Sequence, residues 1–375
     1  MKVLIAGDYC ERFRVEECVA ARDYNKLFDK AVCKYIQTAD YSIVNFEFPI
    51  VVGDKKPLFK CGPNLKGTSL SAEAIKYAGF KCASLANNHI LDYGTDAMLD
   101  TKRILEEIGI DTVGVGENLD DASSVLFKNV NGKSLAIINC CEHEFSLATP
   151  TSPGANPLNP VRQFYNIQEA RKRADYVLVI VHGGHEHWQL PSPRMVELYH
   201  YFVDCGADAV VNHHQHCYSG SEVYHGKPII YGLGNFCFDI QPLKKNDIWN
   251  YGCMAEIVFS GESVEYRLIP IKQCDDNVGV HLSNQISFDK RHLELNAIIA
   301  DSKLLSEKTY EYYKKSMDLC ASIMNPTLNR YILALQRRKF LPTPLTKEWL
   351  VKVQNFVLCE SQRDKLEYYF EHLNQ

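Results

Sequence analysis

The sequence contains no apolar run long enough to cross a membrane. A membrane-spanning helix needs roughly 18 or more consecutive apolar residues, and no stretch of the 375 residues approaches that length. No leader peptide is recognisable either, since the chain opens on Met-Lys-Val-Leu-Ile-Ala-Gly-Asp and a strand begins at once. We therefore expect a soluble protein of the cytoplasm with no membrane span.

The sequence also lacks any block of basic residues. It has 41 Lys and Arg against 46 Asp and Glu, which gives a net charge of -5. This balance argues against nucleic acid as the main partner. An anionic small molecule is compatible with it, because bound metal ions can reverse the charge around a site.

Paired cysteines and repeats are missing as well. The 14 cysteines are scattered without a Cys-x-x-Cys pair, and no internal repeat or low-complexity tract is visible. Cys82, Cys140 and Cys205 lie in or beside apolar runs. Such cysteines are typical of reduced thiols in the core of a cytosolic protein.

What the sequence does have is histidine, gathered in one region. Seven of the 13 histidines lie between His182 and His216. The predicted strand at Val210 and Val211 ends in Asn-His-His-Gln-His, where His214 and His216 are separated by one residue. Two imidazoles at this spacing can bind one metal ion, although surface histidines on a polar loop are an open alternative.

Other predicted strands end in polar side chains in the same way. Asp8 follows the predicted strand at residues 3–6, and Glu47 follows the one at 41–46. Asn87, Asn88 and His89 follow the predicted strand at 83–85, and His182 follows the one at 176–181. A turn or a helix cap is an alternative explanation for Asp8, and an Asn-rich turn for 86–88. Open α/β sheets place their sites at the carboxyl ends of strands. We therefore expect one parallel sheet to bring six groups to one edge: Asp8, Glu47, Asn88, His182, His214 and His216.

This mixed set of oxygen and nitrogen donors suits two divalent ions bridged by a carboxylate. A single closed zinc site would need only four ligands and usually sulfur. The donor types admit Mn, Fe, Zn or Mg.

Several elements are predicted away from these strand ends. Residues 15–35 favour one helix, 53–70 a long loop, and Ser71 the cap of a helix that closes at Gly79. Asn131-Gly132 predicts a β-hairpin. Residues 149–160, rich in Pro, Ser, Asn and Gly, predict a surface loop near the rim of the site.

The pattern changes to long helical periods after about residue 284. We expect two domains, 1–283 and a helical C-terminal extension, 284–375. Apolar stripes on its helices, read as packing surfaces, comprise Trp349, Val353, Phe356 and Val357, then Leu366, Tyr369, Phe370 and Leu373. The extension either covers the main domain or joins copies into a homo-oligomer.

Seven motifs, in order, carry a resemblance to a known family. They are Asp8 in Ala-Gly-Asp, Asn45-Phe46-Glu47, Leu85-Ala86-Asn87-Asn88-His89 with Asp92-Tyr93-Gly94, Gly114-Val115-Gly116-Glu117-Asn118, His182-Gly183-Gly184 with Glu186, Gly206-Ala207-Asp208 through His216, and Tyr231-Gly232-Leu233-Gly234-Asn235-Phe236. Over roughly residues 1–272 the chain resembles the CapA capsule-synthesis family, also called the poly-γ-glutamate capsule protein family. This family is a branch of the calcineurin-like metallophosphoesterases.

The resemblance implies an α/β fold, a four-layer αββα metallophosphoesterase-like sandwich with a two-metal centre. Carried over by position, Asp8 and His216 serve the first metal, Asn88, His182 and His214 the second, and Glu47 bridges them. His89 and Glu186 are the catalytic candidates, with His89 beside the leaving oxygen. The substrate-binding candidates are Asn45, Asn87, His213 and Asn235.

Several positions depart from the expected pattern, among them Asn212, which stands where the family more often has Gly. Where the wider superfamily has Asp-x-His, this chain has Asp8-Tyr9-Cys10, so that either Cys10 ligates as a thiolate or the site has one protein ligand fewer. Gly183 stands where the family often has Trp.

The resemblance implies a binuclear metal-dependent hydrolase of phosphate esters. Its expected role is in making a capsule or surface polymer, poly-γ-glutamate or polysaccharide, by acting on a phosphorylated small molecule or polymer intermediate. The alternative is a catalytically weak metal-binding scaffold that recruits partners in capsule assembly.

Overall fold

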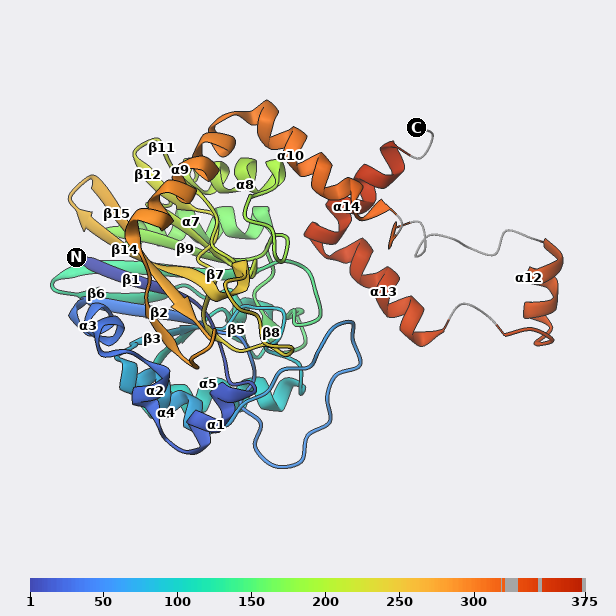
Figure 1. Ribbon diagram of the computed structural model, residues 1–375, viewed down its shortest axis with the longest axis horizontal. Helices are drawn as coiled ribbons and strands as arrows, with labels where there is room; N and C mark the ends of the chain where they lie inside the picture. Colours follow the sequence, from blue (N-terminus) through green and yellow to red (C-terminus); the bar gives the residue numbers. More distant parts are fainter. Residues whose placement is uncertain (318, 321–329, 343–345, 373–375) are drawn as a thin grey trace.

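The computed structural model describes residues 1–317, 319–320, 330–342 and 346–372 of the chain (Figure 1). Two β-sheets lie face to face in its centre, and helices cover the outer face of each sheet. This is the four-layer αββα arrangement that the resemblance implies, and the predicted fold class is confirmed. Among the described residues, no helix combines the length and apolarity that a membrane span requires.

The first sheet has eight strands in the described part of the chain. Its parallel centre is β1, β2, β3 and β4, and β14 runs antiparallel to β1. The strands are β1 (Lys2–Cys10), β2 (Tyr41–Phe46), β3 (Cys82–Ser84), β4 (Asp111–Val113), β13 (Asn235–Phe238), β14 (Tyr251–Ser260), β15 (Ser263–Gln273) and β16 (Val280–Leu282).

The second sheet has six strands in the same described part, with β7, β9, β10 and β12 parallel to one another. They are β6 (Leu126–Val130), β7 (Lys133–Cys141), β9 (Tyr176–His182), β10 (Ala209–His213), β11 (Ser221–Tyr224) and β12 (Lys227–Ile230). The predicted hairpin joins β6 to β7, with Asn131 and Gly132 both at positive φ, as a tight primed turn requires. A short ribbon pairs β5 (Val115–Gly116) with β8 (Gly154–Ala155).

Alternation along the strands explains the layers. In β1, Val3 and Ile5 belong to the cluster between the two sheets, whereas Leu4 and Ala6 belong to the cluster beneath the helices. Successive side chains of a strand point to opposite faces, so a strand buried on both faces reads as one continuous apolar run.

Helices on the first sheet are α1 (Arg14–Ala20), α2 (Tyr24–Leu27), α3 (Lys30–Thr38), α4 (Ser69–Ala78) and α5 (Thr95–Glu107), with α6 (Leu119–Ala122) beside β5. Helices on the second sheet are α7 (Pro160–Arg173) and α8 (Pro193–Asp204). A short 3₁₀ helix, Ile248–Asn250, precedes β14.

The single helix predicted over 15–35 is wrong. Arg22 adopts a φ of 54°, which ends the first helix, and the Asp29 side chain accepts a hydrogen bond from Ala31 N to cap a new one. Ser71 does not cap α4 either. Its hydroxyl is buried and donates to Glu11 Oε2, while Gly79 closes the helix in the left-handed conformation as predicted.

Residues 149–160 are only partly a surface loop. Gly154 and Ala155 form β8 and are buried, and Asn156 Nδ2 donates to Asn139 O at 2.8 Å. The composition correctly indicated an irregular segment. Composition alone cannot show that part of this segment forms a strand, or which strand it pairs with.

The C-terminal segment is helical, as expected. It comprises α9 (Gln285–Ala300), α10 (Ser302–Lys314), α12 (Arg330–Arg337), α13 (Lys347–Leu358) and α14 (Glu360–Glu371). Phe288, Leu295 and Leu305 of α9 and α10 join the main core cluster, while α12 stands apart from the sandwich (Figure 1). The division into domains at residue 283 stays a prediction.

The predicted C-terminal stripes pack in part. Val353, Phe356, Leu366 and Tyr369 form a small cluster over Cys320. Val357 and Phe370 remain exposed, and Leu373 lies outside the described residues.

Candidate metal centre

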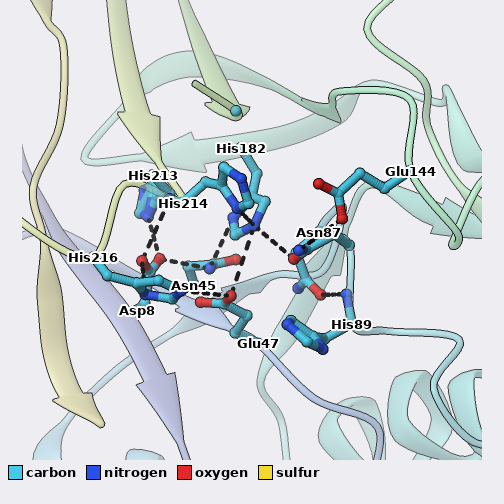
Figure 2. Close-up of polar contacts among 12 residues, drawn as sticks. Asp8, Asn45, Glu47, Asn87, His89, Glu144, His182, His213, His214 and His216 are labelled. Carbon is cyan, nitrogen blue, oxygen red and sulfur yellow. Dashed lines mark hydrogen bonds and ion pairs between the residues drawn. The ribbon is translucent and has the colours of Figure 1, made fainter. Parts of the chain in front are cut away.

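The predicted ligands meet where the carboxyl ends of strands from both sheets converge (Figure 2). Asp8 lies in β1, Glu47 directly after β2 and Asn88 in the loop after β3, all on the first sheet. His182 ends β9, and His214 and His216 follow β10 on the second sheet. The expectation of a single sheet edge is therefore wrong, because the six groups come from two sheets that face each other.

Two sets of three side chains could each hold a metal ion, and both contain Glu47. One is Asp8, Glu47 and His216, and the other is Glu47, His182 and His214. Within each set the potential ligand atoms lie within 4.8 Å of one another. Among the described residues no cysteine belongs to either set, and Cys10 is fully buried with a pKa that burial raises well above its ordinary value.

Asn88 extends the second set. His182 Nε2 lies 3.0 Å from Asn88 Oδ1 and 3.1 Å from His214 Nδ1. Ligand atoms at about 2.1 Å from one ion are separated by roughly 3 Å, so these spacings suit a shared cation. Asn88 Nδ2 donates to Glu144 Oε2 at 3.0 Å, and this bond fixes the amide with its oxygen towards the histidines.

Glu47 supplies the test of whether a cation fits. Both of its carboxylate oxygens are buried, and neither has a hydrogen-bond partner among the described residues. Burial, and then the neighbouring Asp8, raise the pKa of Glu47 well above its ordinary value. His182 Nε2 and His216 Nε2 lie 3.8 Å from Glu47 Oε1, too far for a hydrogen bond. A fully buried carboxylate without hydrogen bonds is costly unless a cation neutralises it, so the residues fit a metal.

Electrostatics around Asp8 reflect the same crowding. Burial opposes its ionisation, but the imidazoles of His216 and His213 outweigh burial and lower the pKa of Asp8. Burial lowers the pKa of His216, yet Glu47 and Asp8 outweigh it and raise that pKa to about 10. A metal at this position must therefore displace a proton from His216.

His182, in the second set, is already in the form that binds metal. Burial, and then the charge of His214, lower the pKa of His182 well below its ordinary value, so that the ring is neutral at neutral pH. Neutral imidazole is the ligand form.

The backbone is strained where it presents these ligands. His214 and His216 have φ values of 87° and 55°, a region that side chains other than Gly seldom adopt. Each such residue costs about 1–3 kcal/mol. Gly7, next to Asp8, has no room for a side chain, because a Cβ there would lie 1.8 Å from Gly234 O. This close approach accompanies the hydrogen bond from Asp8 N to Gly234 O.

His89 lies beside the ligands and is fixed by two neighbours. Its Nδ1 is 2.7 Å from Asp92 Oδ2 and 3.1 Å from Lys60 Nζ. Burial, and then Lys60, lower the pKa of His89. The bond to Asp92 assigns the proton of the neutral ring to Nδ1 and leaves Nε2 for the cavity.

A cavity of about 300 Å³ opens onto the centre. Asn88, His89, Glu186 and His214 line it, together with residues of the C-terminal helices. Glu186 is exposed there, and the neighbouring His214 and His216 outweigh desolvation and lower its pKa. Its catalytic role stays a prediction.

The four predicted substrate-binding residues lie behind the ligands. Asn45 Nδ2 donates to Asp8 Oδ1 at 2.7 Å, and Asn235 Oδ1 lies 2.9 Å from His216 Nδ1. Asn87 donates to Phe46 O, and His213 Nδ1 lies 3.5 Å from Asp8 Oδ1. All four are buried and none lines this cavity, so substrate contact by them stays a prediction.

Gly183 explains one departure from the family pattern. A Cβ at this position would lie 2.6 Å from Glu142 Cγ. The Glu142 side chain fills this space and accepts a hydrogen bond from Arg194 at 2.8 Å.

Sequence reasoning missed several groups around the centre. Asp92 belongs to one of the seven motifs but was given no role, and Glu144 follows a predicted strand as the other site residues do. Lys60 in a loop and Lys365 in a helix carry no signal in the sequence that points to the centre.

The comparison with protein families gives a clear match. The profile described as "Bacterial capsule synthesis protein PGA_cap" matches residues 2–240. This chain belongs to the PGA_cap family. The matched range includes β1 to β13 and all six predicted metal ligands, whereas the C-terminal helices lie beyond it.

Two curated relatives of the PGA_cap chain come from Bacillus. The chain is 35% identical over 247 residues to the capsule biosynthesis protein CapA of Bacillus anthracis, covering 64% of this chain and 60% of CapA. It is 32% identical over 236 residues to the PGA biosynthesis protein CapA of Bacillus subtilis (strain 168), covering 62% of each. The aligned part therefore spans less than two thirds of these relatives. Among solved structures, a novel phosphatase from Mycoplasma pneumoniae aligns with a TM-score of 0.47 at 18% identity, covering 74% of this chain and 95% of that one.

Proposed function

We propose that this chain is a binuclear metal-dependent hydrolase of phosphate esters that acts in the synthesis of a capsule or surface polymer. The observation that carries the proposal is Glu47, a buried carboxylate without a hydrogen-bond partner among the described residues that belongs to both ligand sets. Membership of the capsule synthesis family supports the biological setting. The substrate class is a phosphorylated small molecule or polymer intermediate.

In this proposal Asp8 and His216 would hold one ion, His182, His214 and Asn88 would hold the other, and Glu47 would serve both. Divalent ions in such a site neutralise charge on phosphoryl oxygens and acidify water.

The chain's own residues orient these groups. Asn45 holds Asp8 and Asn235 holds His216, so that the ligand atoms face inward before any ion arrives. Glu144 does the same for Asn88.

His89 is the proposed proton donor to the leaving oxygen. Asp92 accepts a hydrogen bond from Nδ1 and stabilises the ring once it is charged. Protonation then gives Nε2, the nitrogen left for the cavity, a proton to pass to the departing oxygen. The lowered pKa of His89 makes this proton readily released.

The test is hydrolysis of phosphomonoesters and phosphodiesters by protein supplied with Mn or Zn. Glu47→Gln keeps the shape of the side chain but removes its charge, and we expect it to abolish turnover. Glu262→Gln, at an exposed hairpin turn, is the matched control and should keep full activity. Equal activity of the two variants would disprove the proposal.

Metal binding without turnover is the outcome that favours the alternative. A folded protein that binds two ions but hydrolyses no ester in the screen would be a scaffold of capsule assembly. Cys10 motivates this comparison, because it stands where the wider superfamily supplies a further histidine ligand.

A further inference from the structure

The cavity over the candidate metal centre has a second wall, made by the C-terminal helices. Asn355 of α13 and Ser361, Gln362 and Lys365 of α14 line it together with the loop at Lys60. These helices lie beyond residues 2–240, the range of the family match. The family match therefore assigns them no part in the site.

Helix α14 is held against the centre by buried polar bonds. Glu360 accepts hydrogen bonds from His143 N at 2.7 Å and pairs with its ring at 2.5 Å. The Arg194 guanidinium donates one hydrogen bond to Asp364 Oδ1 at 2.9 Å and another to Glu142 Oε1 at 2.8 Å. It therefore links α14 to the residue that follows β7.

A further contact reaches the ligands themselves. Cys359 Sγ donates to Glu144 Oε1 at 3.4 Å, and the other oxygen of Glu144 accepts from the ligand Asn88. The position of α14 is thus tied to the position of the ligands.

Lys365 differs from the other lysine of the cavity. Lys60 is paired with Asp92. In the described part of the chain no ion pair joins Lys365 to a carboxylate; its Nζ donates to Gln362 Oε1 at 3.3 Å and lies over the Tyr312 ring at 5.5 Å. Burial lowers the pKa of Lys365, which shows the cost of keeping this ammonium group partly out of water.

A further polar group in the same wall lacks a hydrogen-bond partner among the described residues. Asn355 Oδ1 is buried and has no hydrogen bond within the described residues. Buried polar atoms are nearly always bonded, so this oxygen is available to a water molecule or to a donor group of a bound ligand. Here that group would be a donor such as a hydroxyl or an amide N–H.

The cavity is larger than the reacting group needs. Its volume of about 300 Å³ corresponds to on the order of ten water molecules at 30 Å³ each. A single phosphoryl group at the ligands therefore leaves space towards α14.

We propose that Lys365 binds a second anionic group of the substrate, a carboxylate or a further phosphate, away from the bond that is cleaved. The inference rests on the proposed function, since it takes the phosphoryl group to bind at the ligand set. It makes α14 a specificity element that selects substrates with two anionic groups.

Binding of phosphonates tests the inference without requiring turnover. Mn-loaded protein is titrated calorimetrically with phenylphosphonate, para-carboxyphenylphosphonate and para-phenylenebisphosphonate. We expect one doubly anionic probe to bind about tenfold more tightly than phenylphosphonate, the effect of one charge-assisted hydrogen bond. The probe whose affinity increases shows whether the preferred second group is a carboxylate or a phosphate.

Three variants complete the binding test. Lys365→Met keeps the apolar stem and should lose the tenfold preference while binding phenylphosphonate as the wild type does. Lys365→Arg should retain part of the preference. Lys303→Met, on the exposed face of α10, is the control and should change nothing.

Kinetics separate this inference from the proposed function. With the corresponding phosphate esters, Lys365→Met should raise KM for the doubly anionic ester and leave kcat for phenyl phosphate unchanged. Hydrolysis without any charge preference would overturn the inference and leave the function intact. Absent hydrolysis with a preserved, Lys365-dependent preference would overturn the function alone. Equal weakening of all probes in Lys365→Met, or no binding of any probe, would overturn the inference.

Discussion

At the scale of single residues, several of the candidate ligands are each paired with a neighbour that orients them. Asn45 holds Asp8, and Glu144 holds Asn88. The sequence predicted the candidate ligands that the structure brings together, because polar side chains that follow apolar strands stand out. It did not predict the orienting partners, since Glu144 is 56 positions from Asn88 and no pattern links the two.

Glu144→Ala tests the importance of this orientation. It leaves Asn88 Nδ2 without its acceptor, so the amide can turn its oxygen away from His182. We expect the affinity of the weaker-bound ion to fall about 10- to 100-fold, as for other groups that orient ligands. Metal titration measures the change, with Glu262→Ala as control. An unchanged affinity would show that Asn88 is not oriented by Glu144.

At the scale of elements, apolar runs located β1, β2, β9 and β10 and the ends that carry the site. They did not show which strands share a sheet. A run of buried residues describes the two faces of one strand, but the pairing partner is set by contacts distant in sequence. For this reason the ligands were assigned to one sheet edge, although β9 and β10 belong to the second sheet.

The contact between His143 and Glu360 predicts that the docking of α14 depends on pH. The bond to Glu360 raises the pKa of His143 above its ordinary 6.5, and the same bond outweighs burial to lower the pKa of Glu360 below 4.5. A raised histidine pKa stabilises docking fully below 6.5 and less as pH rises through the folded-state value. A lowered glutamate pKa stabilises docking above 4.5 and less as pH falls through its folded-state value.

Docking should therefore be strongest between about pH 4.5 and 6.5. Amide hydrogen exchange over residues 347–372, corrected for intrinsic rates, should show weaker protection at pH 9 than at pH 6. His143→Gln should remove most of that difference. A difference that survives in His143→Gln would assign the pH dependence to another group.

At the scale of the whole molecule, the C-terminal helices contact different parts of the main sandwich. Helices α9 and α10 join the main core and α14 lines the cavity, while α12 stands apart (Figure 1). The helical periodicity of these segments was predicted from the sequence, but their placement was not. An apolar stripe indicates that one face of a helix is covered, but it does not identify the element that covers it. Homo-oligomer formation through these helices stays a prediction.

Exposed apolar residues near α12 allow that prediction to be tested. Leu335 and Phe340 are 41% and 74% exposed. If copies associate there, Phe340→Ser should lower the molar mass measured by light scattering to that of one chain. Leu293→Ser, on α9 at a position that is 67% exposed, should leave the mass unchanged. A wild-type protein that is already monomeric would end this hypothesis.

The central claim is a binuclear centre in which both ions share Glu47, and metal content measures it most directly. Elemental analysis compares the wild type with Glu47→Gln and His214→Ala after Mn or Zn is supplied and the excess removed. We predict about two equivalents in the wild type, about one in His214→Ala and close to none in Glu47→Gln. A wild-type protein that stays free of metal, or a Glu47→Gln variant that keeps both ions, would contradict the account.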